Sequence, residues 1–241
     1  MPPSNRCEHY FGGVLSAIAI VPSAPVMVPE LAATAAGELA DLRRAVFAAA
    51  GSLPARWIAV GVGTTDAVLG SDRVGTFAGY GVDVRVTLSP GAAAAPTELP
   101  LCALMAGWVR GQTNPDARAE VRVYSTDHDV DSALVRGRRL RAEIDEAADP
   151  VGVLVVADGA HTLTPPAPGG YDPESVRVQD ALDDALASGD AAALTRLPDT
   201  IVGRVAYQVL AGLIEPAPRS AKELYRGAPY GVGYFTGIWQ P

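Results

Sequence analysis

Two histidines of this chain lie close to carboxylates, each just after an apolar run of strand length. His128 stands between two aspartates and follows residues 121–124, and His161 comes three residues after Asp158, which follows residues 151–157. Two imidazoles and a carboxylate with open positions form the ligand set of many non-haem iron sites. A histidine beside a carboxylate also serves in general acid–base chemistry. The plainer interpretation is that His128 is a solvated residue near a helix start and that His161 caps loop backbone.

Hydroxyl groups follow two further apolar runs, residues 14–21 and residues 57–62. The polar residues there are Ser23 after the first run and Thr64, Thr65 and Asp66 after the second. In an open α/β sheet, ligands bind in the crevice outside the carboxyl ends of the parallel strands. We therefore expect Ser23, the turn at residues 64–66 and His161 to converge in one crevice.

The elements that must position these residues alternate along the chain. Residues 14–21, 57–62 and 151–157 are continuously apolar, which is typical of strands buried on both faces of a parallel sheet. Further strands are predicted at residues 82–88, which alternate and indicate a half-exposed strand, at 121–124 and within 223–239. Helices are predicted at residues 31–50, 99–110, 130–148, 173–188 and 201–213. This alternation predicts an α/β fold with a mostly parallel central sheet flanked by helices on both faces.

Length and composition favour one soluble domain. The chain has 241 residues, of which 49% are hydrophobic and 19% charged, enough to bury a large core. We predict a flexible arm at residues 1–12 and a single α/β domain at residues 13–241. The net charge of −8 disfavours nucleic acid as a partner, because a nucleic-acid surface needs clustered Lys and Arg. No apolar run approaches the ~20 residues of a membrane span. Two cysteines suit a reducing compartment, so we expect a cytoplasmic protein.

Three segments, spread over nearly the whole predicted domain, resemble one known family. They are residues 19–30 (AIVPSAPVMVPE), residues 155–173 (VVADGAHTLTPPAPGGYDP) and residues 224–235 (LYRGAPYGVGYF). Their order and spacing resemble the class III extradiol ring-cleavage dioxygenase subunit-B family, which includes LigB-type and Memo-type proteins. The C-terminal segment is most similar to actinobacterial members. The resemblance implies a mostly parallel α/β fold with a metal in a crevice at the strand ends.

The resemblance also implies a mechanism whose metal ligands this chain lacks. In the family, two histidines and a glutamate hold a ferrous ion, and a further histidine acts as acid and base near the substrate. The first ligand position corresponds to Ser23, and the second falls within residues 61–65, which contain no histidine. The glutamate position falls at Arg226 or Gly227, depending on a one-residue gap. Only the acid–base histidine has a counterpart, His161.

We therefore predict a catalytically degenerate relative, a pseudoenzyme that holds neither iron nor another cofactor. Hydroxyl groups are weak ligands, and Arg226 would place a permanent positive charge where a cation would sit. Such a crevice instead suits a small polar molecule or an anion. The residues expected around it are Ser23, Thr64, Thr65, Asp66, Asp158, His161, Arg226 and Tyr230.

Two other hypotheses stay open. One is a working enzyme with a rebuilt site. Its metal would be relocated to His128, His161 and Asp158, or its chemistry would be metal-free with His161 as the general base. The other is a structural homodimer without a ligand, since the family often oligomerises.

Overall fold

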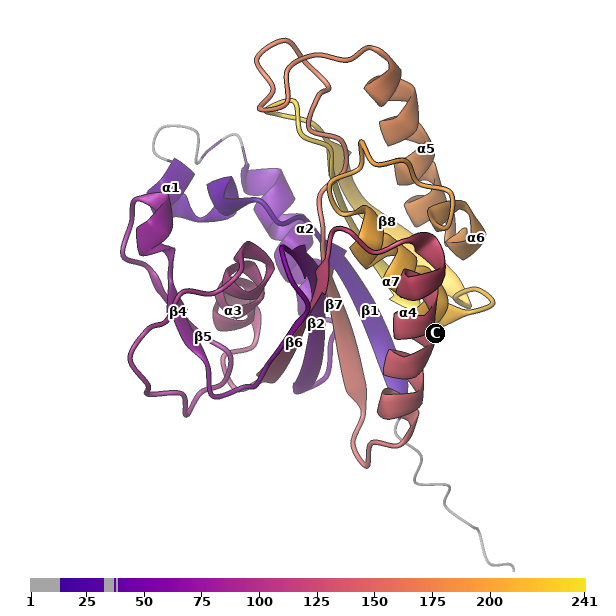
Figure 1. Ribbon diagram of the computed structural model, residues 1–241. Helices are drawn as coiled ribbons and strands as arrows, with labels where there is room; N and C mark the ends of the chain where they lie inside the picture. The colour runs from indigo at the N-terminus through magenta and orange to yellow at the C-terminus, as the bar shows by residue number, and fades with distance from the viewer. Residues whose placement is uncertain (1–13, 33–36, 38) are drawn as a thin grey trace, which may run out of the picture.

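The centre of the molecule is a sheet of seven strands in the order β3-β6-β2-β7-β1-β9-β8 (Figure 1). The computed structural model describes residues 14–32, 37 and 39–241, so the arm predicted at residues 1–12 lies outside the described part. The strands are β1 (Leu15–Val21), β2 (Arg56–Gly63), β3 (Ala67–Leu69), β6 (Arg118–Ser125), β7 (Val151–Val156), β8 (Ser220–Gly227) and β9 (Tyr234–Gln240). The four central strands β6, β2, β7 and β1 run parallel. The other three pair antiparallel with their neighbours. The predicted mostly parallel sheet is confirmed.

The central strands form because their side chains are apolar on both faces. Every residue of β7 is buried, and β1 and β2 are buried through most of their length. Strand β6 instead alternates, because Val121 and Val123 are fully buried while Arg122 and Tyr124 keep part of their surface exposed. The less covered face of the sheet near β6 therefore carries a guanidinium and a phenol.

Helices cover both faces of the sheet, as predicted (Figure 1). The helices are α1 (Pro29–Ala32), α2 (Ala40–Ala50), α3 (Leu101–Thr113), α4 (Val130–Asp145), α5 (Glu174–Ser188), α6 (Ala191–Leu194) and α7 (Arg204–Ile214). Helices α2 and α3 share one hydrophobic core with buried Trp57 and Leu154 of the sheet. Helices α4, α5 and α7 share a second core with Ile20 and Val153. In the described part of the chain, no helix has the length and apolarity needed to cross a membrane.

Two predicted elements differ from the structure. The half-exposed strand predicted at residues 82–88 is shorter in the structure, because only β5 (Arg85–Thr87) forms, and it pairs with β4 (Val74–Thr76) in a two-stranded ribbon separate from the main sheet. The alternating pattern fits such a ribbon equally well, because one of its faces packs on α3. The single helix predicted at residues 31–50 is also wrong, since Leu39, which the structure describes, lies outside any α-helix and α2 begins only at Ala40.

Helix α4 crosses α7 at very short range, and two glycines make this approach feasible. A Cβ atom added at Gly137 would lie 2.2 Å from the carbonyl oxygen of Val209, and one added at Gly212 would lie 2.3 Å from that of Leu134. Backbone therefore packs directly on backbone at the crossing. This contact fixes the position of α4 over the edge of the sheet, next to β6.

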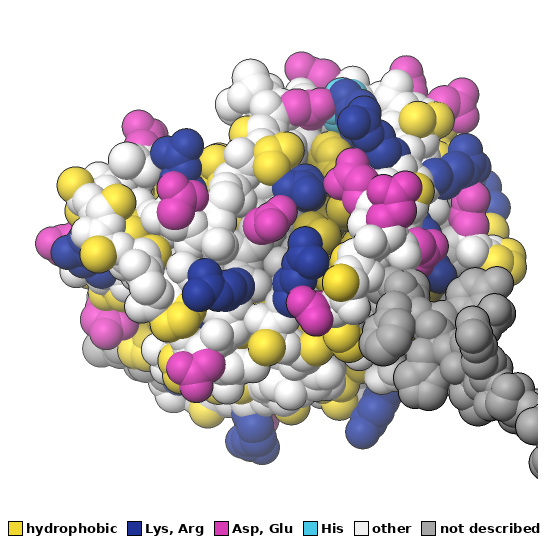
Figure 2. Space-filling view, turned by 90° about the horizontal axis from the view of Figure 1, so that it is seen from below, with side chains coloured by type: hydrophobic (Ala, Val, Ile, Leu, Met, Phe, Trp, Pro, Cys, Tyr) yellow, Lys and Arg dark blue, Asp and Glu magenta, His cyan; other side chains and the backbone are white. Residues whose placement is uncertain are grey.

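The face at the amino ends of the parallel strands carries charges of both signs. Figure 2, which views the molecule from below, shows basic and acidic side chains interspersed on this face rather than gathered by sign. The polar residues that the sequence singled out lie at the opposite edge, where the parallel strands end.

Candidate functional site

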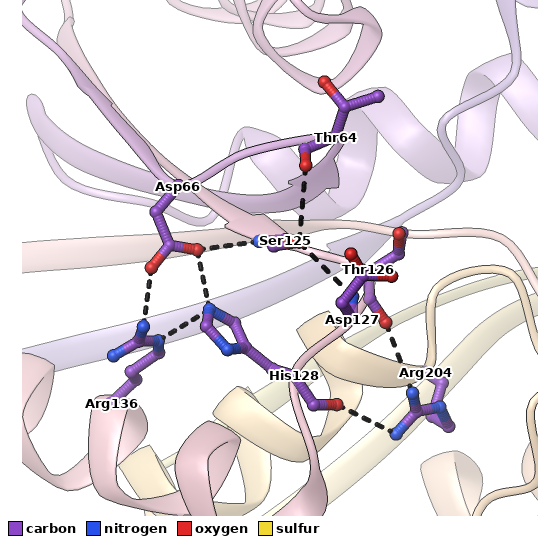
Figure 3. Close-up of polar contacts among 8 residues, drawn as sticks. All are labelled: Thr64, Asp66, Ser125, Thr126, Asp127, His128, Arg136 and Arg204. Carbon is purple, nitrogen blue, oxygen red and sulfur yellow. Dashed lines mark hydrogen bonds and ion pairs between the residues drawn. The ribbon is translucent and has the colours of Figure 1, made fainter.

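A cluster of polar side chains forms where β2 and β6 end (Figure 3). The Asp66 carboxylate accepts a hydrogen bond from the backbone N–H of Ser125 at 2.8 Å. Its Oδ1 lies 2.6 Å from Nε2 of His128, and its Oδ2 accepts from Nη2 of Arg136 at 2.6 Å. The chain brings these residues together because β2 and β6 are parallel neighbours and α4 starts just beyond β6. We call Asp66, Ser125, His128 and Arg136 the Asp66 cluster.

The charge of Asp66 is stabilised within this cluster. Partial burial alone would raise the pKa of Asp66, but the Ser125 N–H, His128 and Arg136 outweigh it and lower that pKa below its usual value. Nε2 of His128 also lies 2.9 Å from Nε of Arg136. That nitrogen accepts from Arg136 when it carries no proton and donates to Asp66 when it does. The position of the ring proton therefore determines whether Nε2 of His128 is hydrogen-bonded to Asp66 or to Arg136.

Of the two threonines expected to donate hydroxyl groups, Thr64 contributes its backbone carbonyl instead. The carbonyl oxygen of Thr64 accepts from Oγ of Ser125 at 3.4 Å, and the side chains of Thr64 and Thr65 are exposed. Beyond β6, Arg204 of α7 donates to the carbonyl oxygens of Thr126 and His128 at 3.3 Å each (Figure 3). These contacts hold the loop between β6 and α4, so the cluster sits on fixed backbone.

A groove of about 420 Å³ opens beside the Asp66 cluster, between α4 and the β3–β6 edge of the sheet. It is lined by Asp66, Ala67, Val68, Arg122, Val123, Tyr124, Arg136, Arg139, Leu140 and Glu143. We call it the arginine groove because three guanidinium groups border it. Its volume lies in the range of small-molecule sites, roughly 300–1,000 Å³.

The guanidinium of Arg122 is the least satisfied polar group in this groove. Its side chain is 16% exposed, and Nη1 is buried without a hydrogen bond to any described residue. Glu120 approaches Nη1 to 3.3 Å, and Glu143 approaches Nη2 to 3.4 Å. Glu143 is shared, because it also lies 3.4 Å from Nε of Arg139. These long contacts leave Arg122 with donors available for a better acceptor.

A second pair of residues joins β1 to β7 at the same edge. The backbone N–H of Ser23 donates to Oδ1 of Asp158 at 2.8 Å. Burial raises the pKa of Asp158 to about 7, although the Ser23 N–H opposes that rise. The phenol of Tyr234 is close by. Burial raises the pKa of Tyr234 most, and the negative charge of Asp158 raises it further. The Ser23 residue thus contributes its amide, not its hydroxyl, to this pair.

His161 is packed against its own loop. Its Nδ1 is buried without a hydrogen-bond partner among the described residues, and a Cβ atom at position 169 would lie 2.7 Å from its Nε2. No hydrogen bond or ion pair between described side chains connects His161 to Ser23 or to Asp158. The expected convergence of His161 with them is therefore not supported by any contact.

The alternative metal site at His128, His161 and Asp158 is not assembled in this structure. His128 is turned to Asp66, which lies 2.6 Å from its Nε2. Among the residues that the structure describes, no three His, Cys, Asp or Glu side chains are grouped so that they could hold a metal ion.

The residues at the family's ligand positions do not fit a ferrous ion either. Arg226 lies on β8, where Nη1 donates to Asp184 at 2.9 Å and Nε donates to Glu223 at 2.9 Å. These contacts raise the pKa of Arg226 further, so the guanidinium keeps its charge. Ser23 is the other counterpart, and residues 61–65 offer no imidazole. Tyr230, also expected near the site, lies in the loop between β8 and β9.

Sequence reasoning missed the arginines that line the groove. Arg136, Arg139 and Glu143 recur at helical spacing along one face of α4, and Arg122 alternates with buried valines on β6. Both periodicities are visible in the sequence. These periodicities show which side chains lie on the same face of α4 or of β6. They do not show that α4 would lie over β6.

Comparison with known proteins supports the fold and no more. No protein-family model matches the chain, and no curated protein does. Among solved structures, the uncharacterized protein JW3007 from Escherichia coli K12 is similar, with a TM-score of 0.58 and 12% sequence identity. The match covers 94% of this chain and 100% of that one. At this identity the likeness shows a shared α/β architecture.

Proposed function

We propose that this chain is a divergent, iron-free relative of the extradiol dioxygenase subunit-B proteins that binds a small organic anion in the arginine groove. One observation carries the proposal. The mostly buried guanidinium of Arg122 keeps an Nη1 donor without a hydrogen-bond acceptor among the described residues. The ion-pair contacts of this guanidinium with Glu120 and Glu143, at 3.3 and 3.4 Å, are longer than the ~2.7–2.9 Å of a strong charge-assisted hydrogen bond, so a carboxylate or phosphate oxygen at closer range would bind it more strongly.

The groups that now face Arg122 are weak competitors for an incoming anion. Glu120 is 38% exposed and lies 3.3 Å from Arg122. Glu143 is 43% exposed and lies at 3.4 Å from both Arg122 and Arg139, and the Arg139 side chain is 82% exposed. Ion pairs this exposed contribute about 0–1 kcal/mol. Asp66 does not compete with an anion for Arg122, because its carboxylate is already bonded to Ser125, His128 and Arg136. An anion can therefore replace Glu143 between Arg122 and Arg139 at little cost.

The rest of the groove limits the kind of anion. Val68 and Leu140 present apolar side chains next to the guanidinium groups, and Tyr124 adds a phenol ring. A bare inorganic ion would leave this apolar surface in water. A molecule that joins one carboxylate or phosphate group to a short apolar body uses both features.

The proposal excludes ring cleavage as the activity, because that activity needs the ferrous ion. The donor set at Ser23, residues 61–65 and Arg226 does not fit such an ion. We further propose that the protein works in the cytoplasm, on the ground that two cysteines in a long chain suit a reducing compartment.

A metal-free enzyme is the second candidate, and the Asp66 cluster favours it. Asp66, which lines the groove, forms a carboxylate–imidazole pair with His128, whose Nε2 lies 2.6 Å from its Oδ1. Such a pair can move a proton to or from a ligand. A bound anion that is chemically changed over time by the wild type, and not by a His128→Ala variant, would favour the enzyme over the binding protein.

Calorimetric titration of the full-length protein tests the proposal. The probes are benzoate and phenyl phosphate, with benzamide as the uncharged match. We expect both anions to bind and benzamide not to bind. Arg122→Gln and Arg139→Gln should each weaken anion binding about tenfold or more, since a hydrogen bond between charged groups contributes about 1.5–3 kcal/mol.

Arg177→Gln is the matched control, because Arg177 is 82% exposed on α5 and pairs only at 3.6 Å with Glu174. It should bind anions as the wild type does. Absence of anion binding by the wild type, or equal binding by the wild type and the Arg122→Gln and Arg139→Gln variants, would overturn the proposal. The exposed Arg139 keeps the test valid if Arg122→Gln does not fold.

A further inference from the structure

A second cavity, distant in the sheet from the arginine groove, lies where β8 ends. It has a volume of about 330 Å³ and is bordered by α5, by the loop after His161 and by the end of β8. The residues that the argument uses are Leu163, Thr164, Val176, Asp180, Asp183 and Arg226. Strands β8 and β6 are separated by four strands of the sheet, so the two cavities are independent sites.

The floor of this cavity carries a buried carboxylate. Asp183 is 6% exposed. Its Oδ1 accepts from Nε2 of Gln179 at 2.8 Å, and among the described residues no hydrogen bond reaches its Oδ2. Buried carboxylates are normally paired with a cation or with several donors. Asp183 has one neutral donor, which leaves its second oxygen for a molecule in the cavity.

The orientation of Asp183 is fixed by Gln179. The side-chain oxygen of Gln179 accepts from the backbone N–H of Ala160 at 2.8 Å, so its NH₂ group must point to Asp183. The amide is wedged between Gly159 and Gly233, where an added Cβ atom would lie 2.0 Å and 2.1 Å from its oxygen. The carboxylate is therefore held in place before any ligand arrives, which lowers the entropic cost of binding.

The charges around the cavity select a cation. Among the described residues that line it, Arg226 is the one that carries a guanidinium, and its donors are directed to Glu223 and Asp184. Asp180 and Asp183 are then two carboxylates for which no described cation lies within ion-pair distance. An anion in this cavity would be repelled by these two carboxylates, and Arg226 already directs its donors to Glu223 and Asp184. A divalent metal would need six or more oxygen ligands, whereas Leu163 and Val176 supply none.

We propose that this cavity binds a protonated organic amine, whose ammonium group donates to Asp183 and whose apolar body packs on Leu163 and Val176. Thr164 also lines the cavity, and its hydroxyl can accept a hydrogen bond from the ammonium. An ammonium that reaches a preformed, desolvated carboxylate makes a charge-assisted hydrogen bond, which is stronger than a neutral one. The apolar walls favour an amine with a small hydrocarbon group over the ammonium ion itself.

Binding should weaken in acid. Burial raises the pKa of Asp183 to about 6, against the effect of Gln179 and Arg226, which lower it, while Glu223 and Asp180 raise it. Below that pH the carboxyl takes up a proton and loses the charge that holds the ammonium. The amine itself stays protonated over this range, so the pH dependence reports on Asp183.

Titration of the full-length protein with 2-phenylethylamine at pH 7.5 tests the inference, with 2-phenylethanol and 3-phenylpropionate as matched uncharged and anionic probes. We expect the amine to bind and the other two not to bind. Asp183→Asn keeps the shape of the side chain and should weaken amine binding about 10- to 100-fold. Val176→Trp, at a partly exposed rim position, should block the cavity and also abolish binding.

Asp145→Asn is the control, because Asp145 is an exposed carboxylate on α4 that pairs with Arg141. It should bind the amine as the wild type does. No amine binding by the wild type, equal binding of amine and alcohol, or undiminished binding by both Asp183→Asn and Val176→Trp would overturn the inference. These results do not depend on the arginine groove, so the two proposals fail separately.

Discussion

The close crossing of α4 and α7 makes Gly137→Ala an informative perturbation. The new methyl group would lie 2.2 Å from the carbonyl oxygen of Val209 and 2.7 Å from the backbone nitrogen of Leu213. Both obstacles are backbone atoms, so the helices themselves must separate, by roughly 1 Å. Overpacking of this kind costs about 1–3 kcal/mol, whereas replacing Gly by Ala in a helix gains at most about 1 kcal/mol. We expect a net loss of stability of about 1–2 kcal/mol.

Gly111→Ala is the matched control for this change. Gly111 is an exposed residue of α3, and an added Cβ atom would meet nothing within 4 Å. Only the gain in helix propensity remains, so this variant should be more stable than the wild type by up to about 1 kcal/mol. The same chemical substitution is therefore expected to act with opposite sign at the two positions.

Urea denaturation of the wild type and both variants measures the effect directly. Gly137→Ala should unfold at a lower urea concentration than the wild type, and Gly111→Ala at an equal or higher one. Because α4 carries Arg136 and Arg139, Gly137→Ala should also weaken anion binding in the arginine groove. If Gly137→Ala proves as stable as Gly111→Ala, the described backbone contact between α4 and α7 is wrong.

Two further predictions concern carboxylates at the strand ends. Asp158 has a pKa of about 7 in the folded protein, above its usual 3.8, so the folded state binds more protons than the unfolded state between those values. Stability should then fall as pH rises from about 4 to about 7, and Asp158→Asn, which can still accept from the Ser23 N–H, should flatten that fall in melting curves. Asp66→Asn should lower stability at pH 7 by about 1 kcal/mol, because it weakens the bonds to Ser125 and Arg136 at a half-exposed site. An unchanged melting temperature would contradict it.

The strands and their common edge could be predicted because apolar runs of strand length leave few alternatives. Residues 14–21, 57–62 and 151–157 became β1, β2 and β7, and the polar residues after them do lie at one edge. The start of α2 only at Ala40 could not be predicted, since the Ala-rich run favours a continuous helix by propensity alone.

The side-chain partners at the site could not be predicted from the sequence. His128 pairs with Asp66, 62 residues away, and Arg226 pairs with Asp184, 42 residues away. Such pairs depend on which way each side chain points after α4 and α5 have packed on the sheet. The pattern of residue types identified His128 and Arg226 as notable, but spacing along the chain says nothing about contacts made across the fold.

Parallel melting curves test most directly the proposal that this fold binds a small anion and holds no iron. Purified protein would be melted alone, with phenyl phosphate, and anaerobically with ferrous iron. A ligand at about 100 times its Kd adds about 2.7 kcal/mol, or roughly 5–10 °C for a chain of this size. We predict such a rise with phenyl phosphate and none with ferrous iron. A rise with iron together with none for the anion, or formation of a yellow ring-opened product when catechol and oxygen are added to the iron sample, would contradict the claim.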